Sequence, residues 1–350
     1  MDYNNMLMHL YDMNEEEIFY KKYYYARQQE YSLQKFLSEL DMAEVLRKRL
    51  IILEKEETLP PKYLDTFFFD MTDANSIVMQ RHNRYSPLFK HAHNYYELMY
   101  MYDGTCKQEI MGNEVVLHTG DLCVLPPEIE HTVSIFDDNT LMFNILLRRD
   151  TLHNMFYQFL NHDNLLSSFF ISDMYSENAN EYILFKTGAD QAIQGAILRM
   201  LWEFENKNLY YNECISSTLM LLFFYIVRSY NDSVKMPQFK NRMDVQRFAM
   251  IQYVSDNYRD ISLSTLAEKF HYTPEYASRL IKEITGMSYS ALLTRIRLER
   301  AQEMLINTNM TVSSIAEAIG FEATEPFIRV FKKKMGLTPT MFRKERSKRI

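Results

Sequence analysis

The chain of 350 residues is 47% hydrophobic and contains 8 Gly and 9 Pro, which excludes a mostly disordered protein and predicts two or three domains of roughly 100–200 residues each. The 3 cysteines form no CxxC pair and their number is odd, which excludes a disulfide framework. The net charge of −7 is the sum of +7 in residues 240–350 and −14 in residues 1–239. This division predicts that only the C-terminal part binds a polyanion.

The chain also lacks the patterns of a secreted or membrane protein. Its first residues, MDYNNMLMHL, are not a basic region followed by an apolar run, so they do not form a signal peptide. The longest apolar run, Leu219–Val227, is far shorter than the ~20 residues that cross a bilayer. We therefore expect a cytoplasmic protein with reduced cysteines and no membrane partner.

Residues 1–61 are expected to form an N-terminal helical extension, because good helix formers with periodic apolar residues run from Tyr31 to Glu57. Four tyrosines between positions 20 and 25 alternate with basic residues. They could form an aromatic and basic nucleic-acid surface, but packing of an amphipathic helix is the favoured interpretation. Pro60 and Pro61 end the segment.

Residues 62–150 carry short β-rich runs separated by turn signals such as Asp103-Gly104 and Gly112-Asn113. This spacing predicts a small antiparallel barrel or sandwich. The predicted strands are Ser76–Gln80, Glu97–Tyr102, Glu109–Met111, Val115–His118, Leu122–Leu125, Thr132–Phe136 and Thr140–Leu147.

The predicted β-domain holds a set of possible metal ligands. His91, His93 and Glu97 form an HxHxxxE pattern, and His131 follows from a later strand. Alternate residues of one strand face the same side, and three imidazoles with one carboxylate suit Fe, Mn, Ni or Zn. The pattern resembles the two motifs of the cupins, which implies a cupin-like barrel and, in the enzymes of that family, a bound metal.

The second motif departs from the enzyme pattern, because Glu128 stands where Gly is usual and no Asn follows His131 at the expected spacing. Cupin-type sensors joined to DNA-binding domains often carry the same box without using a metal. We therefore predict no cofactor, and we assign His91, His93, Glu97 and His131 to strand pairing or to contact with a small organic effector. A metal held by these four residues is the alternative.

Residues 151–236 return to helical patterning, most strongly over Asp190–Val227. The apolar stretch Leu219–Val227 is interpreted as a buried helix that mediates homodimerisation. A linker is expected at Asp232–Gln238, and residues 237–350 are expected to be an all-helical domain.

The last domain contains one helical pattern written twice. Leu266-Ala267-Glu268 recurs 49 positions later as Ile315-Ala316-Glu317. Arg279, Lys282 and Gly286 recur 50 positions later as Arg329, Lys332 and Gly336. Repeated helix-turn-helix units that present basic residues are typical of insertion into successive major grooves, ~34 Å apart. A long helix over Ser290–Asn307 is expected to join the two units.

In each unit, apolar residues at i, i+3, i+4 and i+7 predict the buried face of the second helix. The residues left outward in the first unit are Glu275, Ser278, Arg279 and Lys282. Those left outward in the second are Thr324, Glu325, Ile328, Arg329 and Lys332. Arginine can bind guanine through two hydrogen bonds and Ile328 can contact a thymine methyl, while Lys333, Lys334 and Arg343 are expected at phosphates. Solvation of a helix surface is the alternative, which the repetition of Arg and Lys disfavours.

About 100 residues of this part resemble the AraC/XylS family of transcription regulators. The matching residues are Leu266-Ala267, Ser278–Gly286, Arg297, Ala301 and Leu305, Ile315-Ala316, Gly320-Phe321, Phe327, Arg329, Phe331–Lys333, Gly336–Pro339 and Phe342-Arg343. Pro326 departs from the family pattern within the first turn of the second reading helix, where proline is tolerated if that helix begins near Glu325.

The resemblance implies a multidomain α+β regulator that binds double-stranded DNA as a homodimer and responds to a small effector, such as a sugar or related metabolite. It is not expected to be an enzyme, and as an activator it would contact RNA polymerase. Two rival hypotheses remain. One is a metal-dependent cupin enzyme, an isomerase or dioxygenase, with an accessory DNA-binding domain; the other is a constitutive DNA-binding protein whose barrel is only a scaffold.

Overall fold

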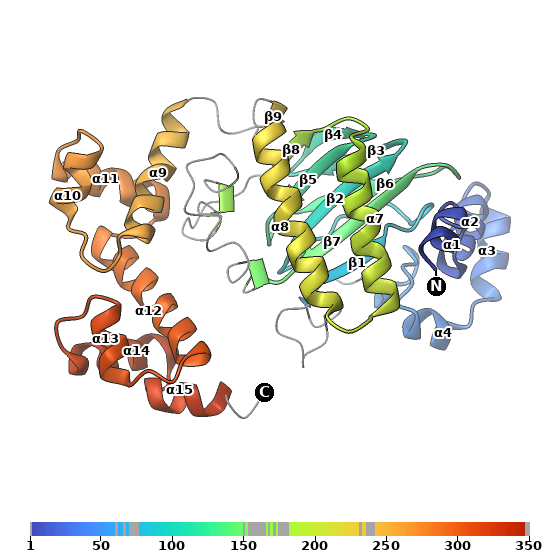
Figure 1. Cartoon of the computed structure of the whole chain (residues 1–350). Coiled ribbons are helices and arrows are strands. Elements are labelled where there is room, and N and C mark those ends of the chain that lie inside the picture. The colour runs from blue at the N-terminus through green and yellow to red at the C-terminus, as the bar shows by residue number, and fades with distance from the viewer. Residues whose placement is uncertain are drawn as a thin grey trace. The chain divides into compact units, whose positions relative to one another are not determined.

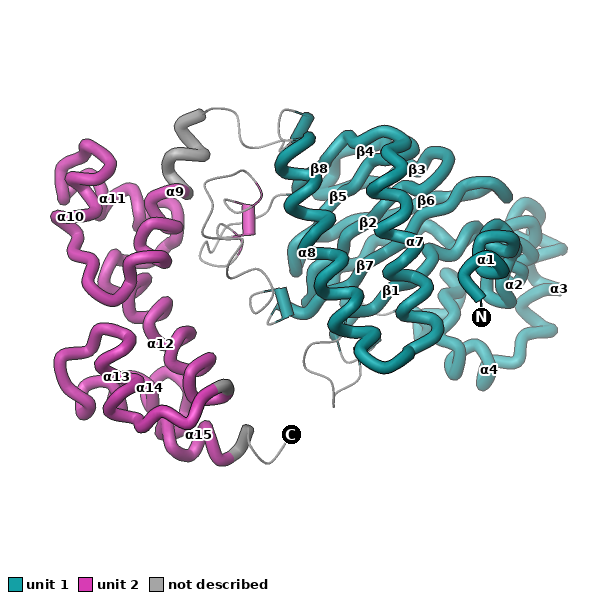
Figure 2. The backbone as a smooth tube through the Cα atoms, in the orientation of Figure 1, with its two compact units in different colours: residues 1–156, 180–238 teal, residues 157–179, 239–350 magenta. Residues whose placement is uncertain are grey.

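The computed structural model describes residues 2–59, 62–65, 68–69, 77–149, 151–152, 166, 169–170, 173, 182–230, 233–235 and 242–346. The chain forms two compact units (Figure 2). The first comprises residues 1–156 and 180–238, and we call it the sensor unit. The second comprises residues 157–179 and 239–350, and we call it the helical unit.

The sensor unit begins with short helices rather than one long helix. They are α1 (Tyr3–Met8), α2 (Glu15–Ala26), α3 (Glu30–Ser38), α4 (Met42–Arg47) and the 3₁₀ turn η1 (Glu56–Thr58). The helix formers after Tyr31 are interrupted because Asp41 caps a new helix, accepting hydrogen bonds from the backbone of Ala43 and Glu44. Tyr20 and Tyr23 are buried, so these two tyrosines pack in the core of this segment.

A buried ion pair attaches these helices to the β-domain. Glu17 lies at the third position of α2, where it completes a capping box with Asn14. The Glu17 carboxylate also accepts hydrogen bonds from Arg84 at 2.8 Å and from Arg81 at 2.7 Å. Glu17 and Arg84 are both nearly inaccessible, and a buried pair of this kind is costly to break because the remaining charge has no partner.

The β-domain is a sandwich of two antiparallel sheets (Figure 1). The six-stranded sheet has the order β1-β7-β2-β5-β8-β9, and the three-stranded sheet has the order β4-β3-β6. The strands are β1 (Ile77–Arg81), β2 (Tyr96–Asp103), β3 (Thr105–Ile110), β4 (Asn113–His118), β5 (Asp121–Leu125), β6 (His131–Ser134), β7 (Leu141–Leu147), β8 (Ile183–Lys186) and β9 (Val234–Lys235).

The prediction that residues 151–236 are helical is wrong at β8. Ile183–Lys186 pairs with β5, which places Leu184 in the core of the sandwich. A short apolar run does not distinguish a strand from a helix by its pattern. The predicted linker Asp232–Gln238 falls largely outside the described residues, and its described part forms β9 against β8. Most of residues 153–181 also lie outside the described residues.

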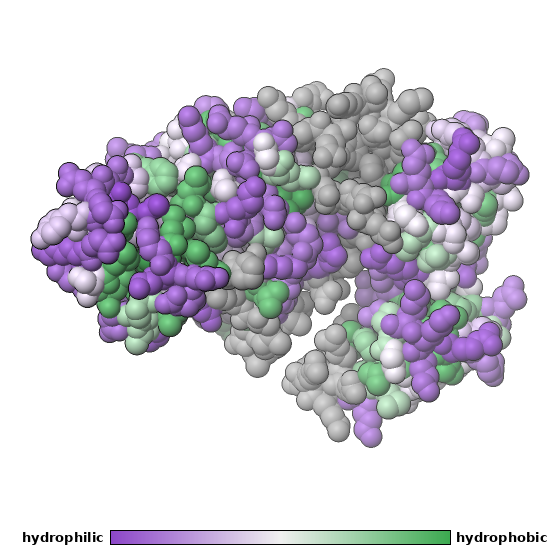
Figure 3. Space-filling model, turned by 180° about the vertical axis from the view of Figure 1, so that it is seen from behind, coloured by the Kyte–Doolittle hydropathy of each residue, from purple (hydrophilic) through white to green (hydrophobic). Residues whose placement is uncertain are grey.

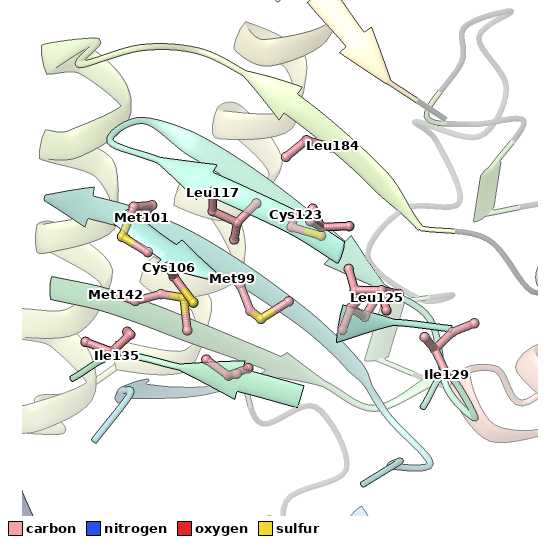
Figure 4. Close-up of a cluster of buried hydrophobic side chains, with 13 residues drawn as sticks. Met99, Met101, Cys106, Leu117, Cys123, Leu125, Ile129, Ile135, Met142 and Leu184 are labelled. Atoms are coloured by element: carbon pink, nitrogen blue, oxygen red, sulfur yellow. The ribbon is translucent and has the colours of Figure 1, made fainter. Parts of the chain in front are cut away.

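The interior of the sandwich is apolar and rich in sulfur (Figure 4). Its buried side chains include Met99, Met101, Cys106, Cys123 and Met142. Burial raises the pKa of the Cys106 thiol to about 11, so this cysteine is a protonated, packed group.

Two helices, in the stretch Asp190–Val227 that is expected to be helical, cover the outer face of the six-stranded sheet (Figure 1). They are α7 (Gln191–Asn206) and α8 (Tyr211–Tyr230). Asp190 caps α7, and its Oδ2 accepts hydrogen bonds from the hydroxyls of Tyr225 and Tyr230 on α8. These bonds fix the two helices to each other. Among the described helices, none has the length and hydropathy required to span a membrane.

Within its described residues 242–346, the helical unit contains seven helices. They are α9 (Arg242–Asp256), α10 (Leu263–Lys269), α11 (Pro274–Thr285), α12 (Tyr289–Asn307), α13 (Val312–Ala318), α14 (Thr324–Met335) and α15 (Pro339–Arg346). The pairs α10–α11 and α13–α14 are the two predicted helix-turn-helix motifs, and α12 is the predicted connecting helix. We call α9–α11 the first lobe and α13–α15 the second lobe.

Candidate nucleic-acid interface and sensor site

The reading helix of the first lobe, α11, is defined at both ends by local signals. Thr273 caps it through a hydrogen bond from the backbone of Tyr276, and Pro274 occupies the first helical position. Gly286 ends it in the left-handed conformation, with φ of 70°. The face containing Ala277, Leu280 and Ile281 is buried, which leaves the opposite face outward.

The predicted DNA-contacting residues of α11 lie on that outward face. Glu275, Arg279 and Lys282 are exposed and Ser278 is half-buried. Within the described part of the chain, Arg279 and Lys282 form no ion pair, and the Arg279 guanidinium lies 5.2 Å from the centre of the Tyr276 ring. An exposed guanidinium without a carboxylate partner is available to bind a base edge or a phosphate.

The reading helix of the second lobe, α14, repeats this arrangement 50 residues later. Gly336 ends it in the left-handed conformation, with φ of 77°. Pro326 is its third residue and therefore lies in the first turn, where backbone N–H groups have no partner within the helix. Its cap differs from that of α11, because Ala323 supplies no side-chain hydrogen bond.

The outward residues of α14 differ in exposure. The exposed residues are Glu325, Arg329, Lys332 and Lys333. Among the described residues, the three basic side chains of this set form no ion pair. Thr324 is half-buried. Ile328 is also half-buried, and part of its side chain packs against the core of the second lobe. Hydrophilic residues surround smaller apolar areas on the face of this unit seen in Figure 3.

Two tyrosines that sequence reasoning missed lie beside the first reading helix. Tyr272 and Tyr276 are half-buried, with ring centres 4.8 Å apart. With His271 and Arg279 they line a depression of about 540 Å³ at the N-terminal end of α11. The signal was present in the sequence, because Tyr276 precedes Arg279 by three positions, and residues three apart on a helix are neighbours.

Arg343, which is expected at a phosphate, forms hydrogen bonds within the second half of the helical unit. Its Nε donates to the carbonyl oxygen of Leu305 at 3.0 Å, and its Nη2 donates to that of Met310 at 2.7 Å. These bonds attach α15 to the last turn of α12 and to the segment that follows it. Arg343 therefore stabilises the second lobe.

The sensor unit gathers three of the four predicted effector residues at one buried point. The Nε2 atoms of His93 and His131 each lie 3.2 Å from Oε2 of Glu97, although neither contact has hydrogen-bond geometry. Each Nδ1 faces a backbone carbonyl, that of Tyr95 at 2.6 Å or that of Ile129 at 3.3 Å. Three donor atoms of these residues lie within 4.8 Å of one another, as in a metal site.

His91 does not belong to that cluster of donor atoms. It forms a β-bridge with His131, stacks on Phe89 with ring centres 4.7 Å apart, and points its Nδ1 towards the Phe89 carbonyl. The structure thus places Asn144, which sequence reasoning missed, next to the carboxylate instead: its Nδ2 donates to Oε1 of Glu97 at 2.8 Å. Asn144 lies on β7, far from the motif in sequence, so spacing gave no signal for it.

Burial and charge determine the protonation of this cluster. Burial alone would raise the pKa of Glu97, but its contacts with His131 and His93 outweigh this effect and hold that pKa well below the ordinary value. Burial lowers the pKa of His91 to about 3 and that of His82, another neighbour missed from the sequence, to about 4. The site therefore has an ionised carboxylate with neutral His82 and His91 close to it.

Comparisons with known proteins find one match in the sensor unit and another in the helical unit. Residues 266–345 match a helix-turn-helix domain family, and residues 78–155 match the AraC-like ligand binding domain. The HTH-type transcriptional regulator YobQ of Bacillus subtilis is 25% identical over 281 residues, which cover 78% of this chain and 96% of YobQ. The transcriptional regulatory protein YesN of the same organism is 39% identical over 101 residues, 27% of each chain.

A solved structure, the C-terminal domain of the response regulator AraT from Geobacillus stearothermophilus, is 35% identical. It covers 30% of this chain and 89% of its own, with a TM-score of 0.29. Two successive helix-turn-helix motifs behind a ligand-binding sandwich define a DNA-binding transcription regulator. The chain carries both matched domains of an AraC-type regulator, the AraC-like ligand binding domain and the helix-turn-helix domain, and its relatives are transcription regulators.

Proposed function

We propose that both lobes contact one DNA duplex through the outward faces of α11 and α14. The observation that carries this proposal is the repetition of Arg279 and Lys282 as Arg329 and Lys332, all exposed. The proposed contacts are Glu275, Ser278, Arg279, Lys282, Thr324, Glu325, Ile328, Arg329, Lys332 and Lys333. Tyr272 and Tyr276 extend this surface in the first lobe.

The test is base preference after removal of one guanidinium. Duplexes selected from a random library by the unmodified chain supply the probe. Arg279→Ala is expected to weaken binding by ~1–3 kcal/mol and to relax preference at one base position. The same loss on every sequence would instead assign Arg279 to a phosphate.

The sensor unit is proposed to bind a small polar effector, such as a sugar or related metabolite, near Glu97 and His131. Support comes from two buried oxygens without hydrogen-bond partners among the described residues, Oε2 of Glu97 and Oδ1 of Asn144. Unpartnered buried acceptors are costly, and ligand hydroxyl groups would satisfy them. His93 takes part in the same cluster, and His91 would shape its wall.

Thermal unfolding against a panel of sugars and related metabolites tests this proposal, because a ligand present at 100 times its Kd adds ~2.7 kcal/mol of stability. Asn144→Leu should abolish the shift for the compound that binds. A shift that persists in Asn144→Leu would place the effector elsewhere, and no shift with any compound would favour a constitutive DNA-binding protein.

A divalent cation is the second candidate ligand of the sensor unit. The Nε2 atoms of His93 and His131 and a carboxylate oxygen of Glu97 converge without hydrogen-bond partners among the described residues. Their Nδ1 atoms face carbonyls, which orients Nε2 as metal-ligating histidines require. Zinc or manganese titrated into the chelator-treated chain should raise its unfolding temperature, and Glu97→Gln should remove that effect. No shift with either ion would exclude them.

Homodimerisation is proposed through α7 and α8. On this pair, Leu221 is 69% and Phe224 is 42% exposed. They line a groove of about 430 Å³ together with Ala192, Ala196, Thr218, Leu222, Tyr225 and Arg228. A second copy would bury this apolar face and bring two pairs of lobes to one operator. Sedimentation of Leu221→Glu tests it: the dimer should dissociate, and an unchanged dimer would contradict this interface.

We further propose that the protein acts in the cytoplasm without catalytic activity, and that it contacts RNA polymerase if it activates transcription. Effector binding would change which arrangement of the DNA-binding lobes is populated. This requires that the effector bind one arrangement more tightly than the other.

A further inference from the structure

The loop between α9 and α10, residues 257–262, touches both lobes of the helical unit. The loop belongs to the first lobe, but the side chain of its Tyr258 packs against the hydrophobic core of the second lobe. Ile261, at the other end of the loop, is buried. The loop is thus a second connection between the lobes, beside α12.

Side chains of α12 hold this loop by its backbone. Arg297 donates from Nε to the carbonyl oxygen of Tyr258 at 2.9 Å and from Nη2 to that of Arg259 at 2.8 Å. The hydroxyl of Tyr289 donates to the carbonyl oxygen of Ile261 at 3.0 Å. Three carbonyls of one loop are therefore bound by one helix, and the guanidinium provides two donors in a fixed geometry.

The second lobe approaches the same point through the turn of its helix-turn-helix motif. A Cβ atom on Gly320 would collide with the carbonyl oxygen of Arg259 and would lie 2.9 Å from Nη2 of Arg297. The φ of Gly320 is +81°, a conformation that also favours glycine. Phe321, the next residue, lies 5.8 Å from the guanidinium of Arg297.

We propose that Arg297 is a positioning residue for DNA recognition: it clamps the loop of the first lobe against Gly320 of the second lobe and so fixes the distance between the two reading helices. A single connecting helix joins the lobes along one axis only, and long helices can curve; a contact away from that axis restricts the motion of one lobe relative to the other. Preorganised lobes bind two successive grooves without an ordering cost. The inference rests on the proposed contact of both lobes with one duplex.

The distance between lobes can be measured without DNA. In the Cys214→Ser chain, spin labels at Ser264→Cys and Ser313→Cys occupy exposed, equivalent positions of the two repeats, and the remaining cysteines, Cys106 and Cys123, are buried. The distance distribution should be narrow in this background. Arg297→Met should broaden it, and Arg297→Lys should broaden it as well, because lysine keeps the charge but lacks the paired donors.

The matched control is Arg295→Met on the same helix, which removes a partly exposed ion pair with Glu299 and should leave the distribution narrow. If Arg297→Met fails to fold, Arg297→Lys carries the test alone. An unchanged distribution in Arg297→Lys would overturn the clamp. Equal broadening by Arg295→Met would overturn it too, since any change to α12 would then have the same effect.

Binding to a selected duplex supplies the second measurement. Arg297→Lys should lower the affinity for DNA about tenfold, the effect of losing charge-assisted hydrogen bonds. One base pair inserted between the DNA segments that the two lobes contact should weaken binding of this variant less than binding of the unmodified chain. A broadened distribution with unaltered affinity would contradict the two-lobe contact but not the clamp. A narrow distribution with weaker binding would contradict the clamp and favour direct contact of Arg297 with DNA.

Discussion

The N-cap residues of the two reading helices can be compared directly, because the repeat places Thr273 and Ala323 at equivalent positions. Both have extended backbone conformations, and φ and ψ at Ala323 are −145° and 155°. Thr273 accepts a hydrogen bond from the backbone of Tyr276, whereas Ala323 has no side-chain acceptor. The helix α14 therefore begins with one more unsatisfied N–H group than α11.

Ala323→Thr should stabilise α14 by ~1 kcal/mol, because it supplies the missing N-cap acceptor. Hydrogen exchange of the α14 amides should slow about fivefold, which corresponds to that free energy. The reciprocal change, Thr273→Ala, should speed exchange in α11 by a similar factor. Equal exchange in α14 before and after Ala323→Thr would show that this helix begins elsewhere.

At the scale of elements, periodicity predicted the helices that have a clear buried face and both helix-turn-helix units. Thr273-Pro274 and Gly286 marked the ends of α11 without any knowledge of its partners. The strand β8 escaped prediction because only its pairing with β5 distinguishes it from a short helix. Asn144 escaped for the same reason, since a cross-strand neighbour of Glu97 has no fixed spacing from it in the sequence.

Two histidines near Glu97, His82 and His91, should make the stability of the sensor unit decrease at acidic pH. Burial lowers the pKa of His82 to about 4 and that of His91 to about 3, so the folded state keeps both neutral while the unfolded chain binds protons below about pH 6.5. The free energy of unfolding should be constant with respect to these groups above that pH. It should fall by ~1.4 kcal/mol per pH unit for each histidine as the pH decreases from 6.5 towards 4.5.

Fluorescence of the single tryptophan, Trp202 on α7 of the sensor unit, reports this unfolding in urea at pH 7, 6 and 5. His91→Gln should make the dependence shallower, whereas His118→Gln, at an exposed position, should not. Glu97 does not contribute to the pH dependence between pH 6.5 and 4.5, because its lowered pKa affects the free energy of unfolding only below the unfolded value of about 4.3. A flat dependence in the unmodified chain would mean that the histidines are accessible to solvent.

For the whole molecule, the net charge of −7 conceals a balance of +7 in residues 240–350 and −14 in residues 1–239. In the basic part, exposed arginine and lysine side chains lie on the outward faces of α11 and α14. Lys333 lies one turn beyond Arg329 on the same side of α14, towards the C-terminal end of the helix, and is exposed. We expect it to neutralise a phosphate, and contacts of this kind release counterions on binding, which makes affinity fall steeply with salt.

Lys333→Ala should therefore weaken binding to all duplexes by a similar factor and reduce the slope of log affinity against log salt by about 1. The measurement is a titration of the full chain with one selected and one unrelated duplex at several salt concentrations between 50 and 200 mM. Glu283→Ala is the control, because it changes an exposed charge on α11 without removing a cation, so the slope should not decrease. A loss confined to the selected duplex would move Lys333 from the phosphate backbone to a base edge, and would extend the reading face of α14 by one residue.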